Sequence, residues 1–238
     1  MDFQIRLGFL LLLPIFFTAA FANLLDARYR ENDIMSEKVS AKINKLFDAM
    51  LPSIHKFILK QGLDPMKLED VSEKLSGIII HDRTLKLTKG WLQGLSNVRR
   101  ANDIILSYQD KSLTLDATLA FDVLDAAYEY LIKDLLITKK GDVHGRLRGA
   151  EMRIIIAFDM NNYKIFLPMA NIVKIDKLNI IFQDDPIVNA AAKAITTIFR
   201  TSITNMVNKE FSKVMQEYVY KINEKIPQPD QLLENNII

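Results

Sequence analysis

Few residues in this chain have the types and spacing that catalysis or metal binding requires. The three histidines, His55, His81 and His144, lie far apart and without the spacing of metal ligands. The chain has no cysteine, which excludes thiol nucleophiles, redox chemistry and most structural zinc sites. It also has no nucleophile-elbow, P-loop, dinucleotide-binding or H-E-x-x-H motif. We therefore expect a protein that is not an enzyme and that uses neither a cofactor nor a metal.

Two features with reactive side chains have simpler structural explanations. His55 falls between apolar positions of a helical pattern, so we interpret it as a structural residue. The pair Asp184-Asp185 has the residue type for acid–base catalysis, but Asp185 directly precedes Pro186 at the start of a second helical pattern. Capping of a helix therefore accounts for the pair.

The basic segment Lys139–Arg148 allows two interpretations. The side chains that share one face of the expected strand are His144, Arg146 and Arg148, with Lys139 and Lys140 nearby. They form either a cationic patch for anionic lipid headgroups or a solvated outer face whose charges pair with acidic residues on the neighbouring strand. Gly145 and Gly149 lie on the other face, where they allow tight curvature or leave room.

The charge balance argues against nucleic acid as a partner. The chain has 31 Lys and Arg and 29 Asp and Glu, a net charge of +2. A nucleic-acid-binding protein needs a clustered excess of basic residues. A hydrophobic content of 49% suffices for a large core, so we expect residues 23–226 to form a single domain.

The first 22 residues have the pattern of a signal peptide. Arg6 gives a basic start, Leu7–Phe17 form an apolar core, and Ala20-Phe21-Ala22 is an A-x-A cleavage site. The apolar stretch is short for a membrane span of roughly 20 residues. We expect cleavage after Ala22 and a secreted, extracellular protein; an uncleaved anchor is the alternative. Residues 227–238 are expected to form a flexible tail.

Helical signals come first in the mature chain. Apolar residues recur at three- and four-residue spacing at Val39, Ile43, Leu46, Phe47, Met50, Ile54, Phe57 and Ile58. The pattern predicts a helix with Asn32 as its N-cap and Gly62 at its C-terminal cap. At Pro52 we expect either a kink or the junction of two abutting helices. A short second helix is predicted from Asp64-Pro65 to about Leu75.

From Gly77 to Phe182 the period changes to two, which predicts strands. In a first strand pair, one side carries Leu85, Leu87, Trp91 and Leu95. In the clearest strand, one face carries Leu113, Leu115, Ala117, Leu119, Phe121 and Val123. Further strands are predicted at residues 103–108, 128–138, 143–158, 163–167 and 173–182, with turns at 109–111, 140–142 and 161–162. We expect an antiparallel meander whose long strands twist and curl around their apolar face.

The last element is a helix that begins at Asp185-Pro186 and ends before Pro227. Its stripe consists of Ile187, Ala191, Ile195, Ile198, Phe199, Met206, Phe211, Val214, Tyr218 and Ile222. At ~1.5 Å per residue it is about 57 Å long. We expect it to lie in the concavity of the sheet, with the first helix closing the open side. Small residues on the candidate inner faces, namely Ala117, Gly145, Gly149, Ala191 and Ala194, favour an apolar void that would admit a lipid.

Three segments resemble the mite group-seven allergen family. They are L-D-P-M-K-L-E-D (63–70), L-K-L-T-K-G-W-L-Q-G-L (85–95) and the stretch D-P-I-V-N-A-A-A-K-A-I-T-T-I-F-R (185–200) with its continuation to residue 211. The similarity spans roughly Ile34 to Asn223. The lack of cysteine fits this family better than the takeout and juvenile-hormone-binding proteins, which usually carry an N-terminal disulfide.

Both groups belong to the tubular lipid-binding superfamily, with bactericidal/permeability-increasing protein and lipopolysaccharide-binding protein. The resemblance implies an α+β super-roll, a long curved antiparallel sheet wrapped around a long C-terminal helix. It also implies that a groove binds lipids or other hydrophobic ligands without catalysis.

We therefore predict a secreted binder or carrier of lipid or other hydrophobic small molecules between the helices and the curved sheet. The predicted lining residues are Phe47, Met50, Ile54, Phe57, Leu119, Phe121, Leu147, Ile195, Ile198, Phe199 and Met206. One alternative is recognition of bacterial lipids or transient contact with membrane surfaces in innate immunity. Another is a structural or storage protein in which the apolar stripes are simply filled core. The sequence names neither the ligand nor the oligomeric state.

Overall fold

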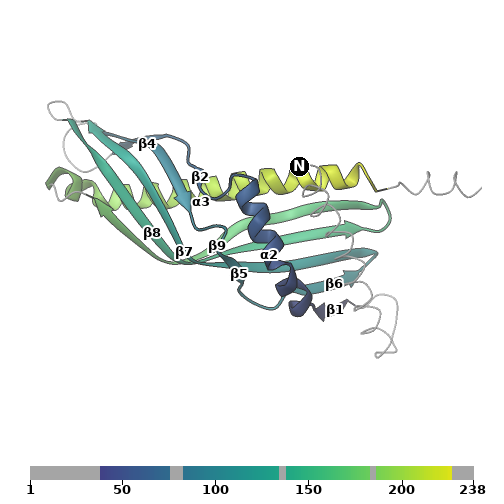
Figure 1. The fold of residues 1–238 in the computed structure, drawn as a ribbon. Helices are drawn as coiled ribbons and strands as arrows, with labels where there is room; N and C mark the ends of the chain where they lie inside the picture. Colours follow the sequence, from purple (N-terminus) through teal and green to yellow (C-terminus); the bar gives the residue numbers. More distant parts are fainter. Residues whose placement is uncertain (1–37, 76–82, 134–137, 183–185, 227–238) are drawn as a thin grey trace, which may run out of the picture.

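A computed structural model describes residues 38–75, 83–133, 138–182 and 186–226 (Figure 1). Within these ranges, two helices and one sheet of nine strands form the fold. The elements in chain order are β1 (Val39–Lys42), α2 (Asn44–Lys60), β2 (Met66–Lys67), β3 (Val71–Leu75), β4 (Arg83–Gln93), β5 (Val98–Arg100), β6 (Ile105–Gln109), β7 (Ser112–Lys133), β8 (Thr138–Asp159), β9 (Lys164–Phe182) and α3 (Pro186–Asn223). This confirms the predicted α+β fold, a long curved antiparallel sheet around a long C-terminal helix.

Three long antiparallel strands run the length of the molecule (Figure 1). β7 pairs with β8 from Ser112↔Asp159 to Lys133↔Thr138, and β8 pairs with β9. The other edge of β7 pairs in turn with β6, β5 and β4, while β1 extends β6 and both β2 and β3 pair with β4. The turns predicted at 109–111 and 161–162 are confirmed; at the first, Asp110 and Lys111 have φ of 49° and 59°.

Two of the long strands were each predicted as two shorter ones. The segments 112–123 and 128–133, predicted as parts of separate strands, form one strand, β7; residues 134–137 lie outside the described ranges, and Thr138 begins β8. Residues 164–167 and 173–182, also predicted as separate strands, form one strand, β9. The turn predicted at 140–142 was wrong, because these residues lie inside β8. Gly141 leaves room for the side chain of Tyr130 on the neighbouring strand β7. A Cβ atom at position 141 would lie only 2.8 Å from the Tyr130 hydroxyl. A glycine that makes room across a strand pair has the same local signature as a turn glycine.

Two large apolar residues point the opposite way from the prediction. In β4 the register shifts between Thr88 and Trp91, and Lys89 has a φ of 54°. This irregularity turns Trp91 to the outer face, where it is 38% exposed, while Leu85 and Leu87 are buried as predicted. In β7 the buried positions pass from Phe121 to Leu124, so the alternation slips and Val123 is exposed.

The first helix is shorter than predicted. α2 begins at Asn44, and residues 39–42 form β1 on the edge of β6, so the prediction that the helix includes Val39 was wrong; the predicted N-cap Asn32 lies outside the described residues. The Asn44 side chain instead joins α2 to the β5–β6 connection, accepting the N–H of Ile104 at 2.8 Å. Pro52 lies inside α2 without ending it. The predicted C-terminal glycine is confirmed, since Gly62 has a φ of 69° and the N–H of Leu63 donates to the carbonyl of Ile58 at 3.1 Å.

The helix predicted from Asp64 to Leu75 was wrong; this segment forms β2 and β3. Asp64 does not cap a following helix. Its carboxylate accepts the N–H groups of Gly94 and Ser96 at 2.9 and 2.7 Å, across the turn that follows β4. The peptide bond Asp64–Pro65 is cis. A tertiary partner thus replaces the local cap that the sequence suggested.

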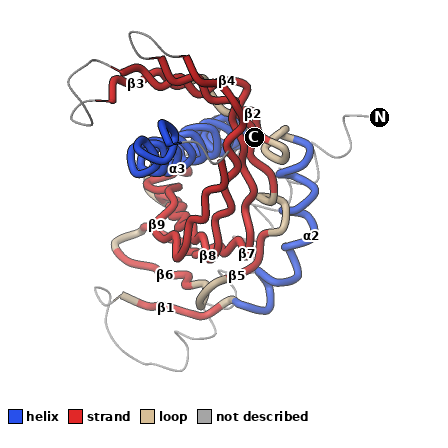
Figure 2. Tube along the Cα trace, turned by 90° about the vertical axis from the view of Figure 1, so that its left-hand side faces the viewer, coloured by secondary structure: helices blue, strands red, loops and turns tan. Residues whose placement is uncertain are grey.

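Helix α3 lies along the inside of the curved sheet. Its 38 residues match the predicted length. Viewed from the end, it lies between β3 and β4 on one side and β9 on the other (Figure 2). α2 runs across the sheet from α3 toward β1 (Figure 1), and its Phe57 packs edge-on against Tyr218 of α3 with ring centroids 4.9 Å apart. The two helices and the sheet therefore enclose one apolar interior.

Candidate ligand-binding site

The eleven predicted lining residues gather in one apolar cluster. Those that are buried are Phe47, Phe57, Leu119, Phe121, Leu147, Ile195, Phe199 and Met206; those partly exposed but packed against them are Met50, Ile54 and Ile198. They come from α2, β7, β8 and α3, elements far apart in the sequence. The structure therefore brings the predicted residues together, and their contact with a ligand stays a prediction.

The centre of this interior is filled by two rings. Phe199 of α3 and Tyr128 of β7 meet edge to face, with centroids 5.8 Å apart. A Cβ added at Gly145 would overlap the ring of Phe199, and one added at Gly90 would overlap the ring of Tyr128. The room that Gly145 was expected to leave is therefore occupied, and the two glycines allow these rings to reach the backbone of the sheet.

Tyr128 also supplies a polar group in this apolar setting. Its hydroxyl donates to the carbonyl of Glu69 at 3.1 Å. Burial of the phenol, together with the nearby charges of Asp70 and Glu69, raises the pKa of Tyr128 well above its usual value. The group therefore stays protonated and acts as a hydrogen-bond donor.

Polar side chains of α3 bind the edge of β9. Asn208 accepts the N–H of Ile172 at 2.7 Å, and Asn223 both accepts from the N–H and donates to the carbonyl of Ile165, at 2.7 and 2.8 Å. The Ser212 hydroxyl and the Arg200 guanidinium donate to carbonyls further along β9. They take the place of a neighbouring strand and protect an edge that has none. These residues could not be predicted from the sequence, in which their only signal is two asparagines, Asn208 and Asn223, beside an apolar stripe.

Apolar side chains remain partly exposed along the N-terminal half of α3. Residues of a helix are about 100° apart, so Ile198 and Arg200 lie on opposite flanks of the buried Phe199. Arg200 contacts β9, and Ile198 therefore lies on the flank away from it, with Ala194 one turn before. On the β9 side, the partly buried residues are Ile175, Leu178, Ile180 and Phe182. We call these two partly open edges the α3 seam.

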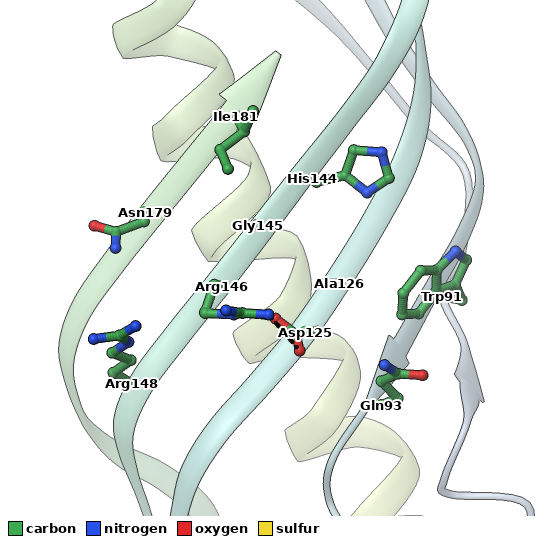
Figure 3. Close-up of a pocket in the computed structure, with 10 residues that line it drawn as sticks. All are labelled: Trp91, Gln93, Asp125, Ala126, His144, Gly145, Arg146, Arg148, Asn179 and Ile181. Carbon is green, nitrogen blue, oxygen red and sulfur yellow. Dashed lines mark hydrogen bonds and ion pairs between the residues drawn. The ribbon is translucent and has the colours of Figure 1, made fainter.

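A pocket of about 430 Å³ lies on the other face of the sheet (Figure 3). It is lined by Trp91, Gln93, Asp125, Ala126, His144, Gly145, Arg146, Arg148, Asn179 and Ile181. None of the eleven predicted lining residues borders it. Gly145 marks the boundary, because its inner side meets Phe199 while its neighbours His144 and Arg146 point outward. We call this hollow the outer pocket.

The outer pocket includes His144, Arg146 and Arg148 from the basic segment Lys139–Arg148. Arg146 forms a two-point ion pair with Asp125 on β7, with Nε–Oδ1 at 2.6 Å and a terminal nitrogen to Oδ2 at 3.2 Å. This confirms, for Arg146, the interpretation that its charge pairs with an acidic residue of the neighbouring strand. Within the described part of the chain, Arg148 has no ion pair or hydrogen bond.

The other candidate reactive groups have structural positions or lie outside the described residues. His55 donates from Nε2 to the carbonyl of Val98 at 2.7 Å, as expected for a structural histidine. His81 and the pair Asp184-Asp185 fall outside the described ranges. In those ranges, no group of three or more His, Asp or Glu residues has the geometry to hold a metal, and neither helix is apolar enough to span a membrane.

A family model and several solved structures match this chain. The model of the Group 7 allergen family matches residues 42–219. Takeout 1 of Epiphyas postvittana has a similar structure at 15% identity and a TM-score of 0.36, over 77% of this chain and 89% of that one. Lipopolysaccharide binding protein is similar at 11% identity and a TM-score of 0.44, over 74% of this chain and 40% of that one. No curated protein matched the sequence.

Proposed function

This chain belongs to the group 7 allergen family, and we propose that it is a non-enzymatic binder or carrier of lipids or other hydrophobic small molecules. The ligand would lie between α2, α3 and the concave face of the sheet. We further propose that the protein is secreted and acts outside the cell, since residues 1–22 have the pattern of a signal peptide.

The observation that carries this proposal is the α3 seam. Ile198, Leu178 and Ile180 keep part of their surface in water beside fully buried neighbours. Separation of α3 from the sheet at this end would expose the interior around Ile195 and Phe199. Binding would then be driven by apolar burial, worth roughly 25 cal/mol per Å² of surface removed from water.

The Ile198 edge of the seam also differs from the rest of α3 in how it is held. The side-chain hydrogen bonds between α3 and β9 described above extend from Arg200, which donates to the carbonyl of the seam residue Ile175, to Asn223 near the C-terminal end of the helix. Around Ile198 the contacts with the sheet are apolar. Apolar contacts have no directional requirement, so an apolar ligand can replace them with little change in free energy.

The test is native mass spectrometry of the full chain secreted from eukaryotic cells, followed by organic extraction of any bound molecule. We expect a discrete apolar compound in near-stoichiometric amount. In a second assay, an apolar fluorescent probe should displace this compound. A protein that carries nothing and admits no probe would contradict the proposal and favour a filled, purely structural core.

A matched pair of variants locates the site. Ile198→Glu places a charge in the seam, and Thr201→Glu places the same charge on the exposed face of the same helix. Ile198→Glu should lower probe affinity by about tenfold or more, because the carboxylate must lose water for the ligand to enter. Thr201→Glu should leave it unchanged. Equal affinity of the two variants at similar thermal stability would place the ligand elsewhere.

A further inference from the structure

The outer pocket lies on the face of the sheet opposite to α3 (Figure 3) and is separate from the interior. The register places its side chains in two rows across four strands. The first row is Trp91, Ala127, His144 and Ile181; the second is Gln93, Asp125, Arg146 and Asn179. Ala127 completes the first row without lining the pocket, which is lined on the same strands by the small residues Ala126 and Gly145.

The walls of the outer pocket are apolar and unusually exposed. Ile181 is 70% exposed on one side and Trp91 is 38% exposed on the other. Trp91 points outward only because of the irregularity in β4. A volume of about 430 Å³ lies within the range of small-molecule sites in proteins. A shallow surface that merely touches a flat bilayer needs no such hollow.

The charges of the outer pocket do not cancel. Arg146 and Asp125 neutralise each other at the floor. Arg148 is exposed, and its cross-strand neighbours are Val123 on β7 and another cation, Lys177, on β9. Within the residues that the structure describes, neither Arg148 nor Lys177 has an acidic partner. Two like charges directly across a strand pair repel each other, and an anion between them would relieve this.

We propose that the outer pocket binds an amphiphile with one anionic head, either a carboxylate or a phosphate, and an apolar body. The head binds the guanidinium of Arg148, whose planar donors suit two-point contacts with either anion. Asn179 lies in the adjacent row and can donate from its amide. The apolar body lies between Trp91 and Ile181.

Trp91 makes this proposal directly measurable, because it is the only tryptophan in the chain. Its emission reports on the outer pocket, while the interior contains none. The experiment is a fluorescence titration of the full chain with decyl phosphate and with decanoate, both below their micelle concentrations. Decyltrimethylammonium, with the same chain length and the opposite charge, is the ligand control.

Two variants on the same face of β8 test the role of the charge. Arg148→Gln removes the proposed head contact, and Lys140→Gln removes the same charge from an exposed position outside the pocket. We expect Arg148→Gln to weaken binding of the anionic ligands about tenfold or more, as for loss of hydrogen bonds to a charged group. Lys140→Gln should change it less than twofold. Thermal unfolding of both variants verifies that they are folded.

The source of the anion is distinguished by a second titration. Vesicles of phosphatidylcholine and phosphatidylglycerol in equal parts present the same phosphate within a membrane. Binding of the monomeric amphiphiles with dependence on Arg148 supports a discrete ligand, and binding only of vesicles with the same dependence supports a lipid headgroup. No change in Trp91 emission with any anionic ligand, equal loss in both variants, or equal affinity for the cationic amphiphile would overturn the proposal.

The outer pocket is tested independently of the proposed carrier function. Ile198 belongs to α3, which lies on the other side of the sheet (Figure 3), so Ile198→Glu should leave the Trp91 titration unchanged. Conversely, Arg148→Gln should leave the compound extracted from the interior unchanged. Either proposal, the interior site or the outer pocket, can therefore be refuted without affecting the other.

Discussion

At the residue scale, the close approach of Phe199 to Gly145 fixes how α3 meets the sheet. The ring occupies the volume that a side chain at 145 would need, and Tyr128 holds it from one side. Protein interiors are packed as densely as organic crystals, so such a contact has little freedom to adjust. It also explains why the inner face of β8 has a glycine directly opposite the longest apolar helix.

We expect Gly145→Ala to destabilise the protein by about 1–3 kcal/mol, the usual cost of an overfilled core. Urea unfolding measures this change. Because the ring of Phe199 is the obstacle, the double variant Gly145→Ala with Phe199→Leu should show a favourable coupling in a double-mutant cycle. Additive effects of the two substitutions would mean that the ring does not contact residue 145 in solution.

Because the pKa of Tyr128 is raised in the folded state, we expect the free energy of unfolding to fall at alkaline pH. This pKa is raised by burial and nearby carboxylates, from a reference value of 10.0. Below pH 10 the phenol of Tyr128 is protonated in both the folded and the unfolded state, and its full contribution to stability is present. Above it the unfolded state loses its proton while the folded state keeps it, so stability falls as pH rises.

The variant Tyr128→Phe separates this effect from the other tyrosines. It should lose about 1 kcal/mol near neutral pH, the value of one hydrogen bond, and its stability should fall less steeply than wild type above pH 10. Urea midpoints measured between neutral and alkaline pH give both slopes. Parallel curves would show that the phenol of Tyr128 ionises as easily in the folded protein as in the unfolded chain.

At the element scale, α3 performs two tasks that the sequence does not separate. Its apolar stripe covers the concave face, and its asparagines complete the hydrogen bonding of the β9 edge. An unprotected edge strand would be open to pairing with another chain. The hydrogen bonds of Asn208 and Asn223 hold the C-terminal part of the helix, whereas the α3 seam combines apolar contacts with the hydrogen bond from Arg200 to the carbonyl of Ile175.

Removal of these hydrogen bonds should loosen β9 locally. Asn208→Ala leaves the N–H of Ile172 without its acceptor, at a cost of about 1–3 kcal/mol. Amide hydrogen exchange should accelerate at Ile172 more than at Ile165, which Asn223 protects. Asn205→Ala is the matched control, since Asn205 lies on the exposed face of the same helix. Identical exchange in the two variants would contradict the assigned contact.

At the scale of the whole molecule, occupation of the interior should stabilise the fold. A ligand that binds only the folded state adds RT ln(1 + [L]/Kd), about 2.7 kcal/mol at 100-fold excess over Kd. For a chain of this size the midpoint of thermal unfolding should rise by roughly 5–10 °C. Delipidated and ligand-loaded protein, compared by calorimetry, provide the measurement. Equal unfolding midpoints at saturating ligand would mean that the ligand does not stabilise the folded state.

The sequence by itself determined the α+β class, the two-residue period of the sheet and the limits of α3. These follow from local alternation, from Pro186 at the first turn and from an apolar stripe that repeats every three to four residues. The sequence also determined which residues are apolar interior, because burial follows side-chain type strongly. All eleven predicted lining residues accordingly lie in one cluster.

Only the tertiary structure decided the conformation of segments whose local sequence favours one element while residues distant in the sequence offer them another. Residues 39–42 and 64–75 have helical patterns, but edges of β6 and β4 offer them hydrogen bonds that outweigh a weak helical propensity. The irregularity in β4 turns Trp91 to the outer face, because a shift of one residue along a strand moves each following side chain to the opposite face of the sheet. The outer pocket follows from that shift and from the pairing of four strands, so its residues, from positions 91 to 181, came together only in the folded chain.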